Sequence, residues 1–206
     1  MTAPVVIMEA RGGCWSRTAS LLLLTVMLFW LPPMVVAGEK EEALALLPEG
    51  KAVLILRHAL APGTGDPPRF RIDDCSTQRN LNARGREQAR AWKPFLRKHG
   101  IERARVLSSQ WCRSMDTGQE MNVGEVEEFP PLNSFFAGRG DRGRQTRDTI
   151  RHVNAMGSDD PIILISHQVN TRALTGRSVR SNQGVIMRLP LERGKRALVR
   201  VRPDSE

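Results

Sequence analysis

The sequence predicts an α/β fold: a three-layer, doubly wound sandwich around a mostly parallel central sheet. Two apolar runs, 52–56 and 162–165, have the length and the branched side chains of buried strands. Segments with helical periodicity separate the predicted strands, and repeated strand–helix units specify a parallel sheet that is covered on both faces. Two alternating segments near the C-terminus, 184–189 and 196–201, predict a closing antiparallel pair.

Composition and helix-capping residues predict the elements in the first half of the fold. A short acidic, Leu-rich lead-in at 39–50 precedes the first strand, 52–57. The segment 59–80 is rich in Pro, Gly and Asp and predicts a long irregular loop, and loops of that length in compact domains usually carry function. Asn82 is a favourable N-cap for a helix that runs to about residue 98, where Gly100 stops it.

The second half continues the alternation as far as the closing pair. Short apolar, β-branched runs predict strands, and longer segments with an apolar stripe predict helices. The predicted elements are a strand at 105–108, a helix at 111–121, a strand at 126–129, a Gly- and Arg-rich loop at 132–143, a helix at 145–155, a strand at 161–166 and a helix at 169–174.

The N-terminal segment has the pattern of a secretory signal. Arg11 and Arg17 precede the apolar run 21–30, and small residues lead up to Ala37. This pattern predicts a signal peptide at 1–37 and a single domain at 38–206, exported to a bacterial periplasm. An uncleaved inner-membrane anchor is the alternative. After cleavage we expect no stable membrane insertion.

The chain is basic, and most of its positive charge is arginine. It has 206 residues and a net charge of +9; removal of 1–37 leaves 169 residues and +8. Arginine binds phosphate and carboxylate groups in a planar fork, so a small phosphorylated or other anionic partner is expected. Nucleic acid is not, because the arginines are scattered, aromatic residues are not interleaved with them, and Tyr is absent. The oligomeric state is not predicted.

Two cysteines, Cys75 and Cys112, remain in the predicted exported domain. An isolated pair in an oxidising compartment is more often bridged than free. We expect a disulfide, with two free thiols as the alternative, because sequence alone does not place the sulfur atoms near each other.

Charged and polar residues stand where three predicted strands end. Arg57 and His58 close the first strand, His167 closes the strand at 161–166, and Arg113 follows the strand at 105–108, near a helix start. The carboxyl ends of parallel strands are where open α/β sheets bind ligands, and a helix N-terminus favours an anion. The pattern therefore predicts one anion-binding pocket. By contrast, Arg151-His152 lies inside a predicted helix and is interpreted as a solvated face.

Further motifs connect these residues with a known family. Leu81-Asn82-Ala83-Arg84-Gly85 opens the first helix, Ser108-Ser109 precedes Arg113, and Ser166-His167 lies late in the chain. With Arg57-His58, they resemble the motifs of the histidine phosphatase superfamily, which has the phosphoglycerate mutase-like fold. The order agrees through nearly all of 38–206, and the segments 74–81 and 167–170 resemble those of exported bacterial members.

The resemblance implies a role for each of these residues. His58 would attack phosphorus and carry the phosphoryl group as phosphohistidine until water removes it. Arg57 and Arg113 would bind the equatorial oxygens, and His167, cationic in the complex, would add a third donor. Phosphoryl transfer needs mainly positioning and charge compensation. No metal and no cofactor are therefore expected.

One part of the family's pattern is missing. Ser134 and Gln168 stand at the two positions where the family usually has an acid, and neither of them is one. A positioned proton donor increases the rate by about 10²–10⁴-fold. Without one, substrates with good leaving groups, such as phosphohistidine or aryl phosphates, are expected to react best. Four aspartates lie in loops that can reach the site, and each is interpreted as a turn former or surface charge. These are Asp66, Asp73, Asp74 and Asp141.

Three functional hypotheses follow. The first is a metal-independent phosphatase that acts through a phosphohistidine intermediate. The second is an anion-binding protein of the same fold with weak catalysis, which the missing acid keeps open. The third is a structural envelope protein, whose melting temperature would not respond to phosphate or vanadate.

Overall fold

The computed structural model describes residues 34–157, 160–195 and 197–203. The chain divides into two compact units, residues 1–36 and 37–206, and the following description concerns the second. Most of the predicted signal peptide, residues 1–33, lies outside the described residues. Residues 34–37 form the first turn of helix α2 (Met34–Ala45). In the part of the chain that the structure describes, no helix has both the length and the apolar character needed to cross a membrane.

A six-stranded sheet forms the centre of the fold, in the order β3-β2-β4-β1-β5-β6. Its strands are β1 (Ala52–Arg57), β2 (Arg105–Ser108), β3 (Val126–Glu128), β4 (Ile162–Ser166), β5 (Gly184–Arg188) and β6 (Ala197–Val201). The first four strands along the chain pair in parallel, and β5 and β6 add an antiparallel edge next to β1. The predicted α/β class, the mostly parallel sheet and the closing antiparallel pair are confirmed.

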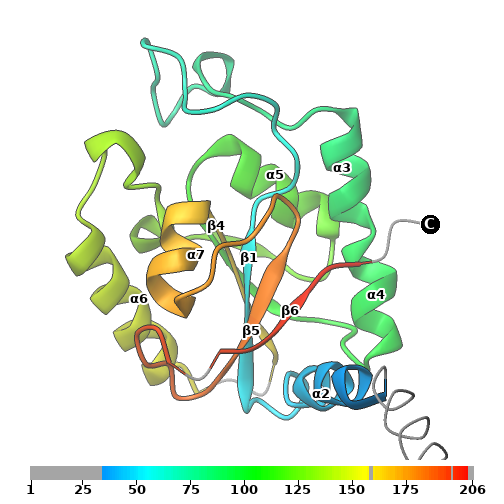
Figure 1. Ribbon diagram of the computed structural model, residues 1–206. Helices are drawn as coiled ribbons and strands as arrows, with labels where there is room; N and C mark the ends of the chain where they lie inside the picture. Colours follow the sequence, from blue (N-terminus) through cyan, green and yellow to red (C-terminus); the bar gives the residue numbers. More distant parts are fainter. Residues whose placement is uncertain (1–33, 158–159, 196, 204–206) are drawn as a thin grey trace, which may run out of the picture. The chain divides into compact units, whose positions relative to one another are not determined.

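Helices cover both faces of the sheet. They are α3 (Ala83–Arg90), α4 (Trp92–Lys98), α5 (Cys112–Met121), α6 (Arg142–Ala155) and α7 (Gln168–Thr175), together with α2 and the 3₁₀ turns η1 (Cys75–Thr77), η2 (Pro130–Leu132) and η3 (Phe136–Gly138). In Figure 1, α6 and α7 lie on one face, and α3, α4 and α5 lie on the other.

The alternation of side chains along β1 explains the three layers. Leu54 belongs to an apolar cluster with Trp92 and other residues of the α2, α4 and α5 side. Its neighbour Ile55 belongs to a second cluster with Val153 of α6 and Leu174 of α7. Because successive side chains of a strand point to opposite faces, a strand that is apolar at every position must be covered on both sides.

Some predicted boundaries are wrong, for local reasons. The helix predicted from Asn82 to residue 98 is two helices that meet at Ala91. Pro94 has no N–H to donate to the carbonyl of Arg90, and its ring crowds that carbonyl, which breaks the helix there. Helix α6 begins at Arg142 instead of residue 145, because the Asp141 side chain accepts a hydrogen bond from the Arg144 N–H and caps the helix.

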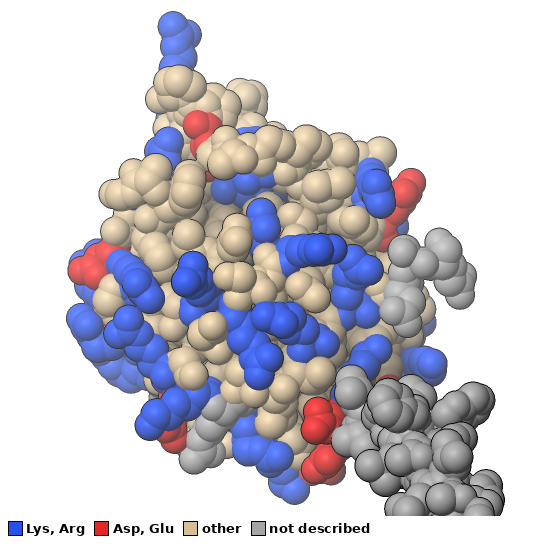
Figure 2. Space-filling view, in the orientation of Figure 1, with Lys and Arg blue, Asp and Glu red and all other residues tan. Residues whose placement is uncertain are grey.

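Positive charge is widely distributed over the visible surface. Figure 2 shows Lys and Arg spread over much of this face, with few acidic groups among them. A surface of this kind attracts anions over a distance of about one Debye length, roughly 8–10 Å at physiological salt.

Candidate active site

The ends of three neighbouring strands bring the predicted residues together. Arg57 is opposite Ser166 in the β1–β4 register, and the His58 N–H donates to the Ser166 carbonyl at 2.9 Å. On the other side of β4, the N–H of Ser109, which directly follows β2, donates to the carbonyl oxygen of Ile165. The two histidines and the Ser108-Ser109 turn therefore leave the sheet side by side. Arg57, His58, Arg113 and His167 all line one pocket.

His58 is buried, and its hydrogen bonds define its tautomer. Nδ1 lies 2.7 Å from the carbonyl oxygen of Ala59. A carbonyl can only accept, so Nδ1 carries the hydrogen and Nε2 keeps a lone pair. Burial, and next the charge of Arg113, hold the pKa of His58 well below its usual value. His58 is therefore neutral, with its lone pair on Nε2, as a nitrogen nucleophile requires.

His167 is also buried, with its ring centroid 5.4 Å from that of His58. Its Nε2 lies 2.8 Å from Ser109 Oγ, whose hydroxyl donates to Asn133; Nε2 is therefore the donor of the ring. Burial, His58 and Arg113 hold the pKa of His167 well below its usual value. The cationic His167 that the family resemblance implies would therefore require the charge of a bound anion.

Arg113 lies between the two imidazoles at the start of α5, and its side chain is 4% exposed. Its Nε–H donates to His58 Nε2 at 3.3 Å, and one terminal nitrogen lies 3.5 Å from His167 Nδ1. Both distances are long for hydrogen bonds, so these contacts orient the groups without holding them tightly.

Arg57 has donor capacity left. One terminal nitrogen donates to the carbonyl of Val179, whereas the buried Nε has no partner among the described residues. Burial, and next the charge of Arg113, lower the pKa of Arg57. A buried N–H without an acceptor costs free energy of about 1–3 kcal/mol, which an anion in the pocket would recover.

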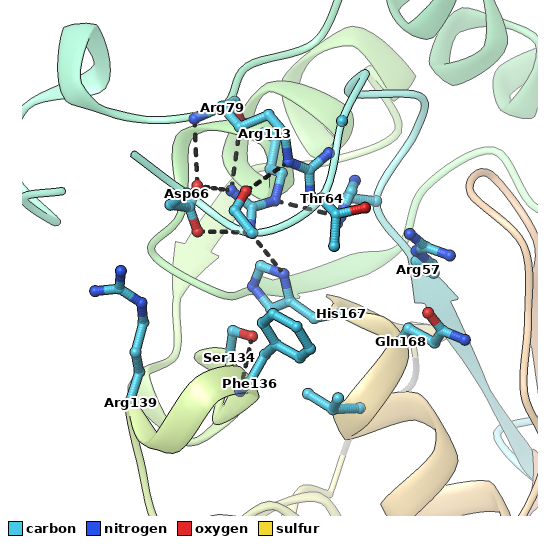
Figure 3. A pocket seen from close by; sticks show the side chains of 14 residues that line it. Arg57, Thr64, Asp66, Arg79, Arg113, Ser134, Phe136, Arg139, His167 and Gln168 are labelled. Carbon is cyan, nitrogen blue, oxygen red and sulfur yellow. Dashed lines mark hydrogen bonds and ion pairs between the residues drawn. The ribbon is translucent and has the colours of Figure 1, made fainter. Parts of the chain in front are cut away.

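The interpretation of Asp66 as a turn former or surface charge is wrong. Its side chain is only 5% exposed and pairs with Arg113, and it also accepts hydrogen bonds from Trp111 Nε1 at 3.0 Å and from the Arg79 N–H at 3.2 Å. Burial raises the pKa of Asp66, but the hydrogen bonds from Arg113 and Trp111 outweigh burial, so the pKa is lowered overall. Figure 3 shows Asp66 directly beside Arg79 and Arg113, with dashed lines marking its contacts with them.

The other three aspartates are placed as the sequence suggested. Asp73 pairs with Arg71 on the surface. Asp74 caps η1, and Asp141 caps α6. Arg151 is exposed on α6, away from the residues that line the pocket.

Arg79 is a site residue that sequence reasoning missed. It lines the pocket, and its guanidinium donates to the carbonyl oxygens of Ala61 and Gly65. Burial, and next the charge of Arg113, lower its pKa to about 10, so it stays cationic at neutral pH. A signal was present, because Arg79 is four residues after Cys75 and the expected bridge would bring that segment next to Arg113.

In the structure Cys75 and Cys112 form a disulfide, with their Cα atoms 5.7 Å apart. Beside it, the N–H of Cys112 donates to Gln78 Oε1 at 3.0 Å. The disulfide links the loop 59–80 covalently to Cys112, the residue before Arg113. It thereby holds Arg79 and Arg113 on the same side of the pocket.

The glycine of the Leu81–Gly85 motif also has a physical reason. A Cβ atom at Gly85 would lie 2.1 Å from the carbonyl oxygen of Leu60. Asn82 caps the same turn through the Gly85 N–H. Only glycine allows α3 to approach the segment that leaves His58 this closely.

The opposite wall of the pocket carries an aromatic ring and two neutral polar side chains, together with Arg139. Phe136 is 48% exposed and lines the pocket with Ser134 and Gln168, below His167 in Figure 3. Arg139, which also lines the pocket, lies over the ring of Phe70, 4.6 Å from its centroid. Neither position that usually carries the family's acid holds one in this chain.

The arrangement can bind a tetrahedral oxyanion. Four guanidinium groups and two imidazoles line the pocket, and Asp66 is its only carboxylate among the described residues. Within those residues, no group of three or more His, Cys, Asp or Glu side chains is placed to hold a metal ion.

Solved structures with this fold are numerous. A protein histidine phosphatase SixA in complex with tungstate is 20% identical, with a TM-score of 0.52, over 74% of this chain and 97% of that one. A structure from Agrobacterium tumefaciens that carries the SixA name has 15% identity and a TM-score of 0.52, over 75% and 99%. Another with that name, from Nakamurella multipartitia, has 15% identity and a TM-score of 0.53, over 75% and 97%.

Likeness at these identities shows a shared fold, and the chain has the fold of the histidine phosphatase superfamily. No family model matches the chain, and no curated protein matches it significantly.

Proposed function

We propose that the protein is a metal-independent phosphatase that transfers a phosphoryl group to His58 and then to water. The observation that carries the proposal is the convergence of His58, with Nε2 as its lone-pair nitrogen, and the guanidinium groups of Arg57 and Arg113. A neutral nitrogen nucleophile next to fixed cations is what in-line phosphoryl transfer requires. Three neighbours of the same fold carry the SixA name, and one of them binds tungstate, a tetrahedral oxyanion.

The test compares wild type with His58→Ala on 4-nitrophenyl phosphate, in buffer with and without a chelator. We expect the variant to lose activity, the wild type to be insensitive to chelator, and an acid-labile phosphoryl group to accumulate on wild type in a rapid quench. Equal rates for the two proteins would contradict the proposal. His152→Gln is the matched control, because His152 is exposed on α6.

An anion-binding protein with weak turnover is the second candidate. Ser134 and Gln168 favour it, because they stand at the positions of the usual acid. In that case, vanadate or phosphate would raise the melting temperature while His58→Ala and wild type would hydrolyse the aryl phosphate equally slowly. A structural envelope protein would show neither effect.

We also propose that the protein works after export. The basic, apolar and small-residue order of 1–37 supports this location, and the disulfide suits an oxidising compartment. The test is N-terminal sequencing of protein from a periplasmic extract, with Gly38 expected as the first residue. A chain that keeps residue 1 and sediments with membranes would favour an uncleaved anchor.

A further inference from the structure

Resting on the function proposed above, we infer that Asp66 supplies the proton that the leaving group needs. A phosphoryl group takes the place of Asp66 on Arg113, and the displaced carboxyl group then protonates the leaving oxygen. The inference starts from the buried carboxylate of Asp66, which is paired with Arg113 and which the proposed mechanism does not otherwise use.

The first step of the argument is that Arg113 binds a carboxylate in the same way as it would bind phosphate. Its two terminal nitrogens donate to the two oxygens of Asp66, at 2.6 and 3.2 Å. This two-pronged geometry is the one in which guanidinium recognises both carboxylate and phosphate. Asp66 therefore occupies the fork that the phosphoryl oxygens would use.

The second step is that Arg113 has no donor to spare. Its Nε faces His58, and its terminal nitrogens also contact the Arg79 carbonyl and His167. A phosphoryl oxygen can therefore bind Arg113 only by exchange with one of these partners. Among those partners in the described residues, Asp66 is the anion, and it is the one that a second anion repels.

The third step concerns the proton. Burial favours the neutral form of Asp66, and the hydrogen bonds from Arg113 are the largest of the contributions that lower its pKa, ahead of those from Trp111 and the Arg79 backbone. Once the bonds from Arg113 go to phosphoryl oxygens and a dianion lies beside Asp66, burial and like-charge repulsion both favour proton uptake. The charged and titratable groups that line the pocket around Asp66 come from several elements. They are Arg113 on α5, Arg79 on the loop 59–80, Arg57 at the end of β1, His58 directly after β1, His167 after β4 and Arg139 after η3.

The fourth step is that the carboxyl group stays in the pocket after the exchange. Trp111 Nε1 and the Arg79 backbone N–H hold its two oxygens independently of the Arg113 fork. Figure 3 shows Asp66 on the side of His167 opposite Ser134, whose position usually carries the acid. Asp66 would thus approach the leaving group from a different wall of the pocket.

The reaction then balances. His58 Nε2 forms a bond to phosphorus, the bond from phosphorus to the leaving oxygen breaks, and the Asp66 proton moves to that oxygen, so the product leaves as a neutral alcohol. In the second half, Asp66 accepts a proton from the attacking water while the bond from His58 to phosphorus breaks and inorganic phosphate forms.

The test uses two substrates of similar size, 4-nitrophenyl phosphate, which has a good leaving group, and 4-nitrobenzyl phosphate, which has a poor one. Asp66→Asn should lose about 10²–10⁴-fold in kcat on the benzyl substrate and no more than about tenfold on the phenyl substrate. Asp66→Glu should recover part of the benzyl rate. Asp73→Asn is the control, because Asp73 is an exposed aspartate of the same loop.

A binding measurement tests the exchange itself. Sulfate remains a dianion from pH 5 to 8, so protons taken up when it binds must go to the protein. Calorimetry in buffers of different ionisation heat should show greater proton uptake by wild type than by Asp66→Asn, and binding by the variant should be at least as tight.

Three results would overturn the inference: an equal loss on both substrates, no loss on the benzyl substrate, or identical proton uptake. If His58→Ala hydrolyses the phenyl substrate as fast as wild type, the proposed function itself fails. If His58→Ala is inactive while Asp66→Asn keeps both rates, only the inference fails.

Discussion

The backbone N–H of His58 donates to the carbonyl oxygen of Ser166 at 2.9 Å, one residue beyond the last pair of the β1–β4 ladder. This bond extends the parallel pairing one residue past the end of β1. It places His58 and His167 next to each other although 109 positions separate them in the sequence. The two imidazoles and Arg57 are thus positioned by backbone pairing, and the other arginines come from loops and a helix start.

The disulfide is expected to stabilise both the fold and the anion site. The chain-entropy estimate for a loop of this length is about 4 kcal/mol in the free energy of unfolding. The double variant Cys75→Ser, Cys112→Ser, or reduction with dithiothreitol, should lower stability by up to that amount and weaken phosphate binding, because Arg79 and Arg113 lose their shared anchor. Urea unfolding and calorimetric titration measure the two effects. If reduction changes neither, the bridge does not couple the loop to the site.

Arg79→Ala is expected to weaken binding of phosphate or vanadate. Arg79 lies in the pocket wall and stays cationic, with a pKa of about 10. A charge-assisted hydrogen bond contributes about 1.5–3 kcal/mol, so the dissociation constant should rise by roughly 10- to 150-fold. Arg79→Lys should recover part of the affinity.

The matched control for Arg79 is Arg71→Ala. Arg71 belongs to the same loop, but its side chain is 65% exposed and pairs with Asp73 on the surface. It should leave the dissociation constant unchanged. Equal losses in the Arg71 and Arg79 variants would assign the effect to general charge and not to a contact in the pocket.

Gly85→Ala is expected to destabilise the fold and to displace the segment that follows His58. The new Cβ would overlap the carbonyl of Leu60, which is two residues after His58. Overpacking of this kind costs about 1–3 kcal/mol in the free energy of unfolding, and moving Leu60 should also weaken phosphate binding. Gly157→Ala is the control, because nothing lies within 4 Å of a Cβ there. Comparable behaviour of the two variants in urea unfolding would refute the close-packing argument.

The sequence predicted the sheet and its histidines because those signals are local. The two central strands, β1 and β4, are short runs of mainly apolar residues, and His58 and His167 directly follow them. Asp66 could not be found in this way, because it lies in a loop without periodicity. Its burial depends on Trp111 and Arg113, which are 45 and 47 positions away. The break before Pro94 was predictable in principle from the missing N–H.

Stability is expected to fall as pH is lowered below about 6.5, the ordinary pKa of histidine. Burial depresses the pKa values of both His58 and His167 in the folded chain, so below that pH the unfolded chain binds more protons than the folded one. Below about pH 6.5 the free energy of unfolding therefore increases as pH rises and decreases as pH falls. The slope is about 1.4 kcal/mol per pH unit for each histidine that must stay neutral.

Denaturant titrations between pH 5 and 8 measure this slope. The double variant His58→Gln, His167→Gln should flatten it, since neither glutamine takes up a proton, whereas His152→Gln should not, because His152 is exposed on α6. The pKa of Asp66 is also lowered in the folded chain. Asp66 therefore also decreases the free energy of unfolding as pH falls, but only near and below its ordinary pKa of 3.8, outside the range of pH 5 to 8. A slope that survives in the double variant would mean that other groups, and not the two buried imidazoles, set the acid sensitivity of the fold.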